Sequence, residues 1–180
     1  MEEIIKHIDM EMLKSYSYQG SYTDEYLFFT DKLENIFQEN KNVKLEFFLM
    51  IYCIEGEIKL ELNNSPHHLH QKDLIISLPN TIIGQVLASP NHKIKIICFS
   101  NRLLQRLTQT EKYTWKWVCY IQKNPIKHFE GEEEKLFNQY LDLIESKAQT
   151  GINKIQKEIL SVTILFSATT ILSAVFQPIK

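Results

Sequence analysis

The chain has 180 residues, of which 44% are hydrophobic, and its formal net charge is −2. This apolar content is sufficient for a folded core, which excludes a disordered chain. The only arginines among the 20 basic residues are Arg102 and Arg106, whereas proteins that grip nucleic acid normally present an arginine-rich basic face. We therefore do not expect these residues to contact DNA directly.

The N-terminal part predicts a short amphipathic helix over Glu2–Tyr16, because apolar residues recur there at helical spacing. A polar, tyrosine-rich linker follows. Two short strands are then predicted over Tyr26–Phe29 and Leu33–Phe37, with a polar segment between them.

The densest run of predicted strands lies in the middle of the chain. Lys44–Ile54 is apolar, and after Gly56 the strict alternation over Glu57–Leu62 indicates a strand with one buried and one solvated face. Further strands are predicted over Leu74–Leu78, Thr81–Ala88 and Lys93–Ser100. About eight closely spaced strands with short polar turns favour a small, cupin-like β-barrel within residues 1–100.

The periodicity changes at Asn101, and residues 101–180 are predicted to be mainly helical, with a short extended piece over Ile126–Phe129 after Pro125. A helix over Lys112–Gln122 precedes two long helices, Glu132–Ala148 and Ile152–Phe176. The last helix is apolar on two sides, so it needs two partners, the preceding helix and a second copy of the chain. The predicted dimer interface consists of Tyr140, Ile144, Ile155, Ile159, Val162 and Phe166.

The cellular compartment is predicted from the cysteines and the apolar segments. Cys53, Cys98 and Cys119 lie far apart in apolar segments, as expected of buried, reduced thiols in a cytoplasmic protein. The N-terminus is too polar for a signal peptide. Ile159–Phe176 is uncharged but rich in serine and threonine and has no flanking basic cluster, so we expect a packed helix and no membrane span.

A group of histidines is the most conspicuous candidate for metal binding. His68 and His70 are two residues apart, which places both on one face of a strand. Leu69 between them requires burial, which turns both histidines toward solvent, and no carboxylate follows at the spacing of a cupin metal motif. We therefore predict no metal and no cofactor, with His68 and His70 as weak candidates.

Three segments, IYCIEGEIKLELNN, HHLHQKDLIISLPNTIIGQV and KIKIICFSNRLLQRL, together resemble the N-terminal cupin-like domain of AraC-family transcription regulators, particularly those of gut Bacteroidetes. The resemblance rests on Gly56 before an alternating strand, on Lys72-Asp73-Leu74, on Pro79-Asn80 and on Ser100 before a helix. In such regulators the two long helices pair two copies, and two helix-turn-helix units that follow them read DNA.

The resemblance implies a non-catalytic domain that senses a small effector, forms a homodimer and reaches DNA only through a helix-turn-helix part that is absent from this chain. A pocket is expected in the barrel interior. Alternation assigns to that interior Met50, Tyr52, Ile76, Leu78, Ile96 and Cys98. These side chains can equally be a filled barrel core.

Two other functions stay open at this point. One is a stand-alone metal-dependent cupin enzyme, an isomerase or a dioxygenase, which needs three or four inward ligands. The other is a dimeric interaction module that binds no small molecule. The sequence contains no Gly-x-Ser-x-Gly motif and no phosphate-binding glycine loop, so it does not support nucleophilic hydrolysis or phosphoryl transfer.

Overall fold

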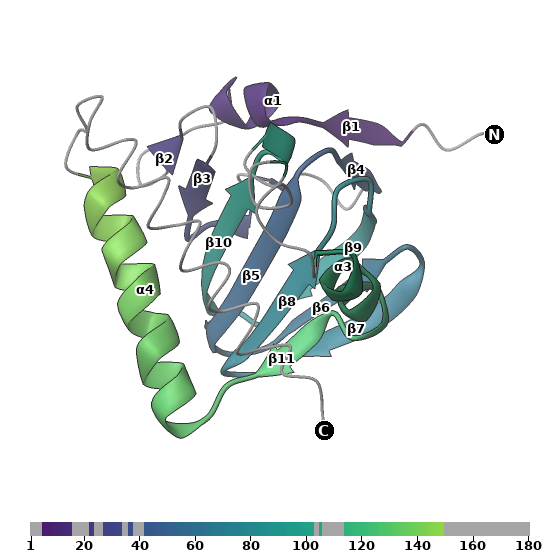
Figure 1. The fold of residues 1–180 in the computed structure, drawn as a ribbon. Coiled ribbons are helices and arrows are strands. Elements are labelled where there is room, and N and C mark those ends of the chain that lie inside the picture. Colours follow the sequence, from purple (N-terminus) through teal and green to yellow (C-terminus); the bar gives the residue numbers. More distant parts are fainter. Residues whose placement is uncertain are drawn as a thin grey trace.

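Two β-sheets and the helices α1 (Met10–Ser15), α3 (Thr114–Lys123) and α4 (Gly131–Gln149) make up most of the described part of the chain, in a computed structural model (Figure 1). The structure describes residues 5–15, 22–23, 27–33, 36–37, 42–102, 105 and 114–149. The prediction of a mainly β fold with helices toward the C-terminal end is confirmed. Its strands are distributed over two sheets that pack face to face.

The first sheet has five strands. In spatial order they are β1 (Lys6–Ile8), β4 (Val43–Leu45), β9 (Ile82–Ala88), β6 (Ile58–Leu62) and β7 (Ser65–Leu69). β1 pairs with β4 in parallel, and the other neighbours are antiparallel. One face of this sheet is buried and the other is solvated, as the alternation within Glu57–Leu62 predicts.

The second sheet has six strands. In spatial order they are β11 (Ile126–His128), β8 (Asp73–Ser77), β5 (Phe48–Glu55), β10 (Lys93–Phe99), β3 (Leu27–Thr30) and β2 (Tyr22–Thr23). All of its pairings are antiparallel. β11 joins the edge of this sheet and confirms the short extended piece predicted over Ile126–Phe129.

The inner strands of the six-stranded sheet are buried on both faces, which explains their unbroken apolar runs. Leu49, Ile51 and Cys53 of β5 belong to a core between the two sheets. Met50 and Tyr52, which alternate with them, belong to a second core on the opposite face. The central strand therefore contributes to both cores.

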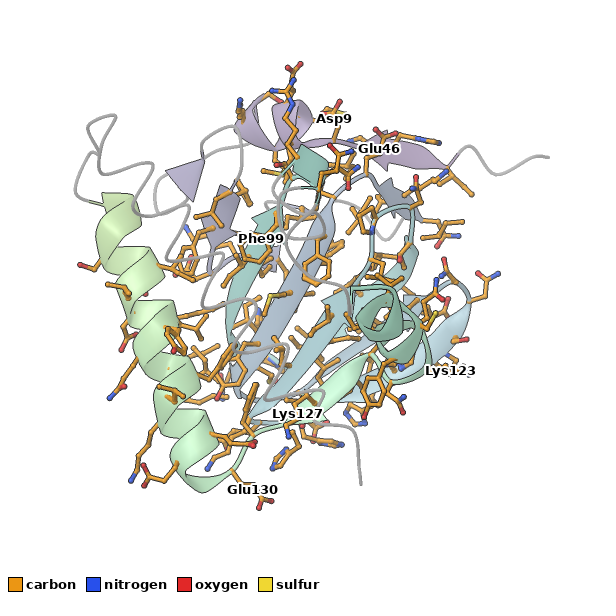
Figure 2. All side chains as sticks on the ribbon, in the orientation of Figure 1. Asp9, Glu46, Phe99, Lys123, Lys127 and Glu130 are labelled. Atoms are coloured by element: carbon orange, nitrogen blue, oxygen red, sulfur yellow. The ribbon has the colours of Figure 1, made fainter. Side chains whose placement is uncertain are left out.

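Helix α4 (Gly131–Gln149) lies along the outer face of this sheet (Figure 1). Phe137, Leu141 and Ile144 are its buried contacts in the second core. Side chains from the helix and the sheet occupy the space between them (Figure 2). Helix α3 (Thr114–Lys123) leads into β11, and Ile121 is its residue in the same core.

The N-terminal segment departs from the prediction of one helix over Glu2–Tyr16. Lys6–Ile8 forms β1, and α1 (Met10–Ser15) begins only after it. The Asp9 carboxylate accepts a hydrogen bond from the Met12 amide at 2.8 Å, so Asp9 caps α1. Parallel pairing with β4 takes the residues before Asp9 out of the helix.

The predicted strand over Leu33–Phe37 is wrong at its described residues. The amides of Ile36 and Phe37 both donate to the carbonyl of Leu33, at 3.0 and 2.8 Å, which is the pattern of a turn. Leu33 and Ile36 are buried in the core between the sheets. Their apolar character therefore reflects the packing of a turn rather than of a strand.

Other predictions concern the helices, the cysteines and a membrane span. Helices α3 and α4 confirm the helices predicted over Lys112–Gln122 and Glu132–Ala148, with shifted ends. Cys53 and Cys98 are buried as expected, whereas Cys119 is exposed, which corrects that part of the prediction. Ile152–Phe176 lies outside the described residues. Within the part of the chain that the structure describes, no helix combines the length and apolarity that a bilayer crossing requires.

Candidate functional site

A cavity of about 560 Å³ lies where the β6–β7 hairpin, the end of β8 with the turn after it, and the end of α3 meet. Cavities of about 300–1,000 Å³ are typical of small-molecule sites. Its lining consists of Leu62, Asn63, Ser65, His67, Ile76, Ser77, Leu78, Pro79, Asn80, Thr81, Ile121, Gln122, Lys123 and Pro125.

The cavity combines apolar walls with a few polar groups. Burial lowers the pKa of His67, which favours its neutral imidazole. The hydroxyl of Thr81 donates to the Leu78 carbonyl at 2.7 Å. The Ile76 amide donates to the carbonyl of Pro125 at 2.8 Å and holds the segment after α3 against β8. Such a lining fits a small molecule with both apolar and polar parts.

The six predicted pocket residues do not form one set in the structure. Ile96 and Cys98 lie in the core between the sheets. Met50, Tyr52 and Ile76 lie in the core beneath α4, and Leu78 packs against that core. Two of the six, Ile76 and Leu78, line the cavity. The expectation that all six face one interior is therefore wrong, because both faces of the sheet are apolar and alternation alone cannot distinguish them.

Tyr52 is enclosed by aromatic rings beneath α4. Its ring centroid lies 4.9 Å from that of Phe137 and 6.1 Å from that of Phe129, both in edge-on geometry. Burial raises the pKa of the Tyr52 hydroxyl, and the negative charge of Glu134 raises it further. Tyr52 is thus a neutral residue of the helix–sheet core.

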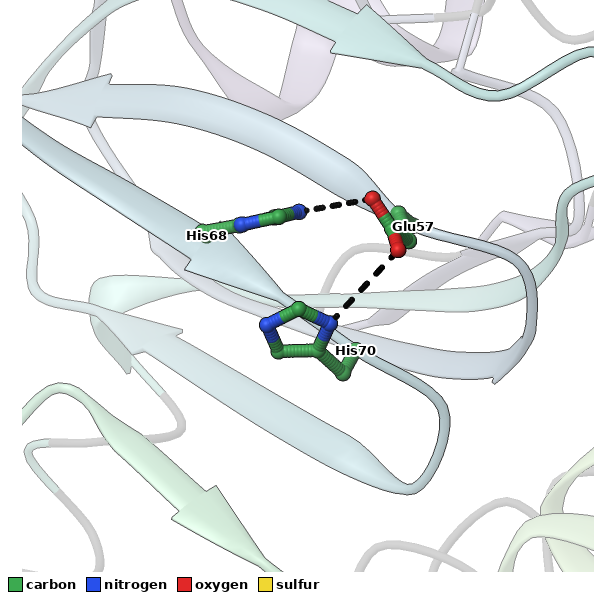
Figure 3. A group of neighbouring side chains, drawn as sticks. All are labelled: Glu57, His68 and His70. Atoms are coloured by element: carbon green, nitrogen blue, oxygen red, sulfur yellow. Dashed lines mark hydrogen bonds and ion pairs between the residues drawn. The ribbon is translucent and has the colours of Figure 1, made fainter.

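Glu57, His68 and His70 form a cluster at the open end of the β6–β7 hairpin (Figure 3). The Nε2 atom of His68 lies 3.0 Å from Oε2 of Glu57, and Nδ1 of His70 lies 3.8 Å from Oε1 of the same carboxylate. Both histidines are exposed, as the full burial of Leu69 between them requires. The cluster stands on the solvated face of the five-stranded sheet.

Sequence reasoning missed Glu57 as the carboxylate of this cluster. Asn63 and Asn64 have φ values of 48° and 64°, which is the geometry of a two-residue hairpin turn. This turn pairs Ile58 with Leu69, so that Glu57 comes opposite His70. The Asn-Asn pair between two strands is the sequence signal from which this register could have been found.

The turn after His70 is tied to the C-terminal elements by polar contacts. The buried Asp73 accepts from the His70 amide at 2.7 Å, and its other oxygen lies 2.7 Å from Nδ1 of His128 in the segment of β11. Lys72 donates to a carboxylate oxygen of Glu134 in α4 at 2.8 Å. A displacement of this turn therefore reaches both β11 and α4.

The predicted dimer residues fall into two groups. Ile144 is buried against the sheet with 5% of its surface exposed, and Tyr140 is partly buried beside it. Leu136 and Leu143 of α4, by contrast, are exposed. The remaining predicted interface residues, Ile155, Ile159, Val162 and Phe166, lie outside the described residues.

No protein-family model and no curated protein sequence matches the chain. Solved structures do match its fold. A crystal structure of apo ToxT from Vibrio cholerae superposes with a TM-score of 0.51 over 83% of this chain, at 8% sequence identity. The fold is that found in AraC-family transcription regulators.

Two further structures are similar to the chain over different lengths. The AraC-like transcriptional activator CuxR covers 82% of the chain, with 11% identity and a TM-score of 0.49. An RmlC-like cupin from Shewanella frigidimarina covers 43%, with 19% identity and a TM-score of 0.31. The chain spans 57% of the length of ToxT and 49% of the length of CuxR.

Proposed function

We propose that this chain is the ligand-sensing and dimerising part of an AraC-family transcription regulator and that it acts in the cytoplasm without catalysing a reaction. The observation that carries the proposal is the superposition on ToxT, which extends over 83% of the chain. The role of the chain is to change the state of a DNA-binding part in response to a small effector.

The cavity at the end of α3 is the effector site in this proposal. An effector acts by binding one conformation of its receptor better than another. Ile121, Gln122 and Lys123 of α3 line the cavity, and Pro125 connects α3 to β11. β11 in turn precedes α4 directly. Occupancy of the cavity therefore changes contacts in the segment that leads to α4.

Thermal unfolding with an added ligand tests this site. ToxT has been crystallised with an unsaturated fatty acid bound, so an unsaturated fatty acid is the first probe, followed by sugars and small carboxylates. Binding to the folded state raises the melting temperature. We expect Leu78→Trp, which fills the cavity, to abolish this rise, and Leu87→Trp, at an exposed position of β9, to preserve it. An equal response of both variants would contradict the assignment.

We place the dimer contact on the exposed side of α4 together with the C-terminal segment. Leu136 and Leu143 are exposed large apolar residues on this helix, and association would remove them from water. Sedimentation velocity should show a dimer for the wild type and a monomer for Leu143→Asp and Val162→Asp. Gln85→Asp, which adds the same charge to an exposed position of β9, should stay dimeric. A dimeric Leu143→Asp would remove α4 from the interface.

Sequencing the gene beyond the codon of Lys180 tests the DNA-binding role. The reading frame beyond Lys180 should encode two helix-turn-helix units, each with a recognition helix for the major groove. A stop codon there would favour the interaction-module function.

The alternative cupin enzyme needs inward metal ligands, whereas the Glu57–His68–His70 cluster stands on a solvated face. Such a position does not exclude water from a reacting group.

A further inference from the structure

We propose that Glu57, His68 and His70 form a binding site for a divalent transition-metal cation, with zinc as the best-fitting ion. The site is independent of the effector cavity, because none of its three residues lines that cavity. It lies on the solvated face of the five-stranded sheet, at the end where β6 begins and β7 ends (Figure 3).

The spacing of the donor atoms fits such an ion. One donor atom from each of the three side chains lies within 4.8 Å of the others. Two ligands of a tetrahedral zinc ion, each about 2.0–2.1 Å from the metal, are about 3.3 Å apart. The imidazole nitrogens of His68 and His70 lie 3.0 and 3.8 Å from different oxygens of the Glu57 carboxylate, on either side of that value, so the carboxylate must turn one oxygen toward the ion. Small rotations of these exposed side chains complete the geometry.

The backbone presents the three side chains together before any ion binds. His68 and His70 project on the same side of their strand, and their ring centroids are 4.1 Å apart. The hairpin register fixes Glu57 beside them. The bond from the His70 amide to Asp73 holds the turn that follows. The backbone therefore needs no rearrangement when a cation binds, and the entropy lost is that of the three side chains.

The donor set selects the class of cation. Two imidazole nitrogens and one carboxylate suit zinc and its neighbours among the divalent transition metals, whereas magnesium and calcium prefer oxygen ligands. Three protein ligands leave a coordination position for water or for a group of another molecule. Lys59, opposite His68 in the register, brings a positive charge to the same face and reduces the affinity.

Isothermal titration calorimetry with zinc chloride on the untagged, full chain tests the proposal. We expect saturable binding of one zinc ion per chain. Glu57→Gln, His68→Gln and His70→Gln should each weaken it by at least about tenfold, the smallest loss typical of removing even an outer-shell partner. Cobalt(II) absorption should show tetrahedral bands in the wild type that are lost in each variant. Circular dichroism checks that the variants, all at exposed positions, remain folded.

Matched controls separate this site from other histidines and thiols. His7 and Glu46 form an exposed pair at 3.1 Å, so His7→Gln removes a histidine with one carboxylate neighbour and should leave zinc affinity unchanged. Cys119→Ser removes the exposed thiol and should also leave it unchanged.

Three outcomes would overturn the proposal. They are no saturable binding by the wild type, wild-type affinity in all three cluster variants, and loss of binding in Cys119→Ser. None of them bears on effector binding at the cavity, because the ligand experiment is run without zinc.

Discussion

Lys95 of β10 donates from Nζ to Oε2 of Glu145 in α4 at 2.7 Å and to Oδ1 of Asp142 at 3.1 Å. Burial lowers the pKa of Lys95, but the two carboxylates outweigh it and the pKa is raised overall, so the amine is charged. Its side chain is 17% exposed, against 36% for Glu145 and 74% for Asp142. This contact attaches the helix to the sheet beside the apolar core.

Loss of the Glu145 carboxylate should weaken the attachment of α4. We expect Glu145→Gln to lower the free energy of unfolding by about 1 kcal/mol, because the partly buried amine of Lys95 then loses the carboxylate that is less exposed to solvent. Asp142→Asn should cost less than about 0.5 kcal/mol, since that carboxylate is mostly in solvent. Urea denaturation measures both. Equal costs would show that the shielding of Glu145 has no effect.

Asp73 should be the polar residue whose loss does most damage to the turn before β8. Asp73→Ala removes the acceptor of the His70 amide and the partner of His128 together, and the cost should be about 1–3 kcal/mol. Asp73→Asn keeps one acceptor oxygen and should cost less. His128→Gln leaves the His70 contact in place and removes the half-exposed imidazole that lies between Asp73 and Glu130. If it proves as costly as Asp73→Ala in chemical denaturation, the His70 contact contributes little.

Gly56 should be intolerant of any side chain. Its φ is +84°, and an added Cβ would meet Ser89 Oγ as well as the Cα of His92 at 3.0 Å. Gly131 also has a positive φ, of +58°, but a Cβ there meets nothing within 4 Å. Gly131→Ala should therefore lower the free energy of unfolding by about 1 kcal/mol, through backbone strain alone. The loss for Gly56→Ala should be larger, because steric overlap adds to the strain. Thermal unfolding of the two variants makes the comparison, and equal melting temperatures would refute the steric contribution.

His67 should make the fold less stable in acid. Burial lowers its pKa in the folded state, so below the unfolded value of about 6.5 the unfolded chain binds the proton more readily. Its contribution is fully present above about pH 6.5 and is lost as the pH falls through the folded pKa. The urea midpoint of His67→Gln should therefore fall less between pH 7.5 and pH 5 than that of the wild type. An identical fall would mean that His67 titrates alike in both states.

The sequence predicts the parts of this fold whose two sides differ in polarity. Glu57–Leu62 alternates clearly, and its strand and buried face are as predicted. Alternation assigns Met50 and Ile96 to one interior, but the two residues occupy opposite faces, because a strand covered on both sides carries no polarity signal. The apolar residues Leu33 and Ile36 predict a strand but form a turn, since a buried turn can have the same composition as a strand.

Prediction of the candidate sites was limited by register and by tertiary contacts. The outward direction of His68 and His70 follows from Leu69 alone. The proximity of Glu57 depends on a two-residue turn, which one residue more or less would change. The cavity could not be predicted, because residues from α3 approach the β6–β7 hairpin only in three dimensions.

Strand β5 has a mechanical consequence that follows from its place between the two cores. Alternate side chains of this strand pack into the core on each side, so a shift of its backbone displaces atoms in both cores. Because both cores are closely packed, neither can accommodate such a shift alone. A substitution that changes the side-chain volume at Ile51 should therefore displace Tyr52, and the ring contact of Tyr52 should pass this displacement to Phe137 of α4.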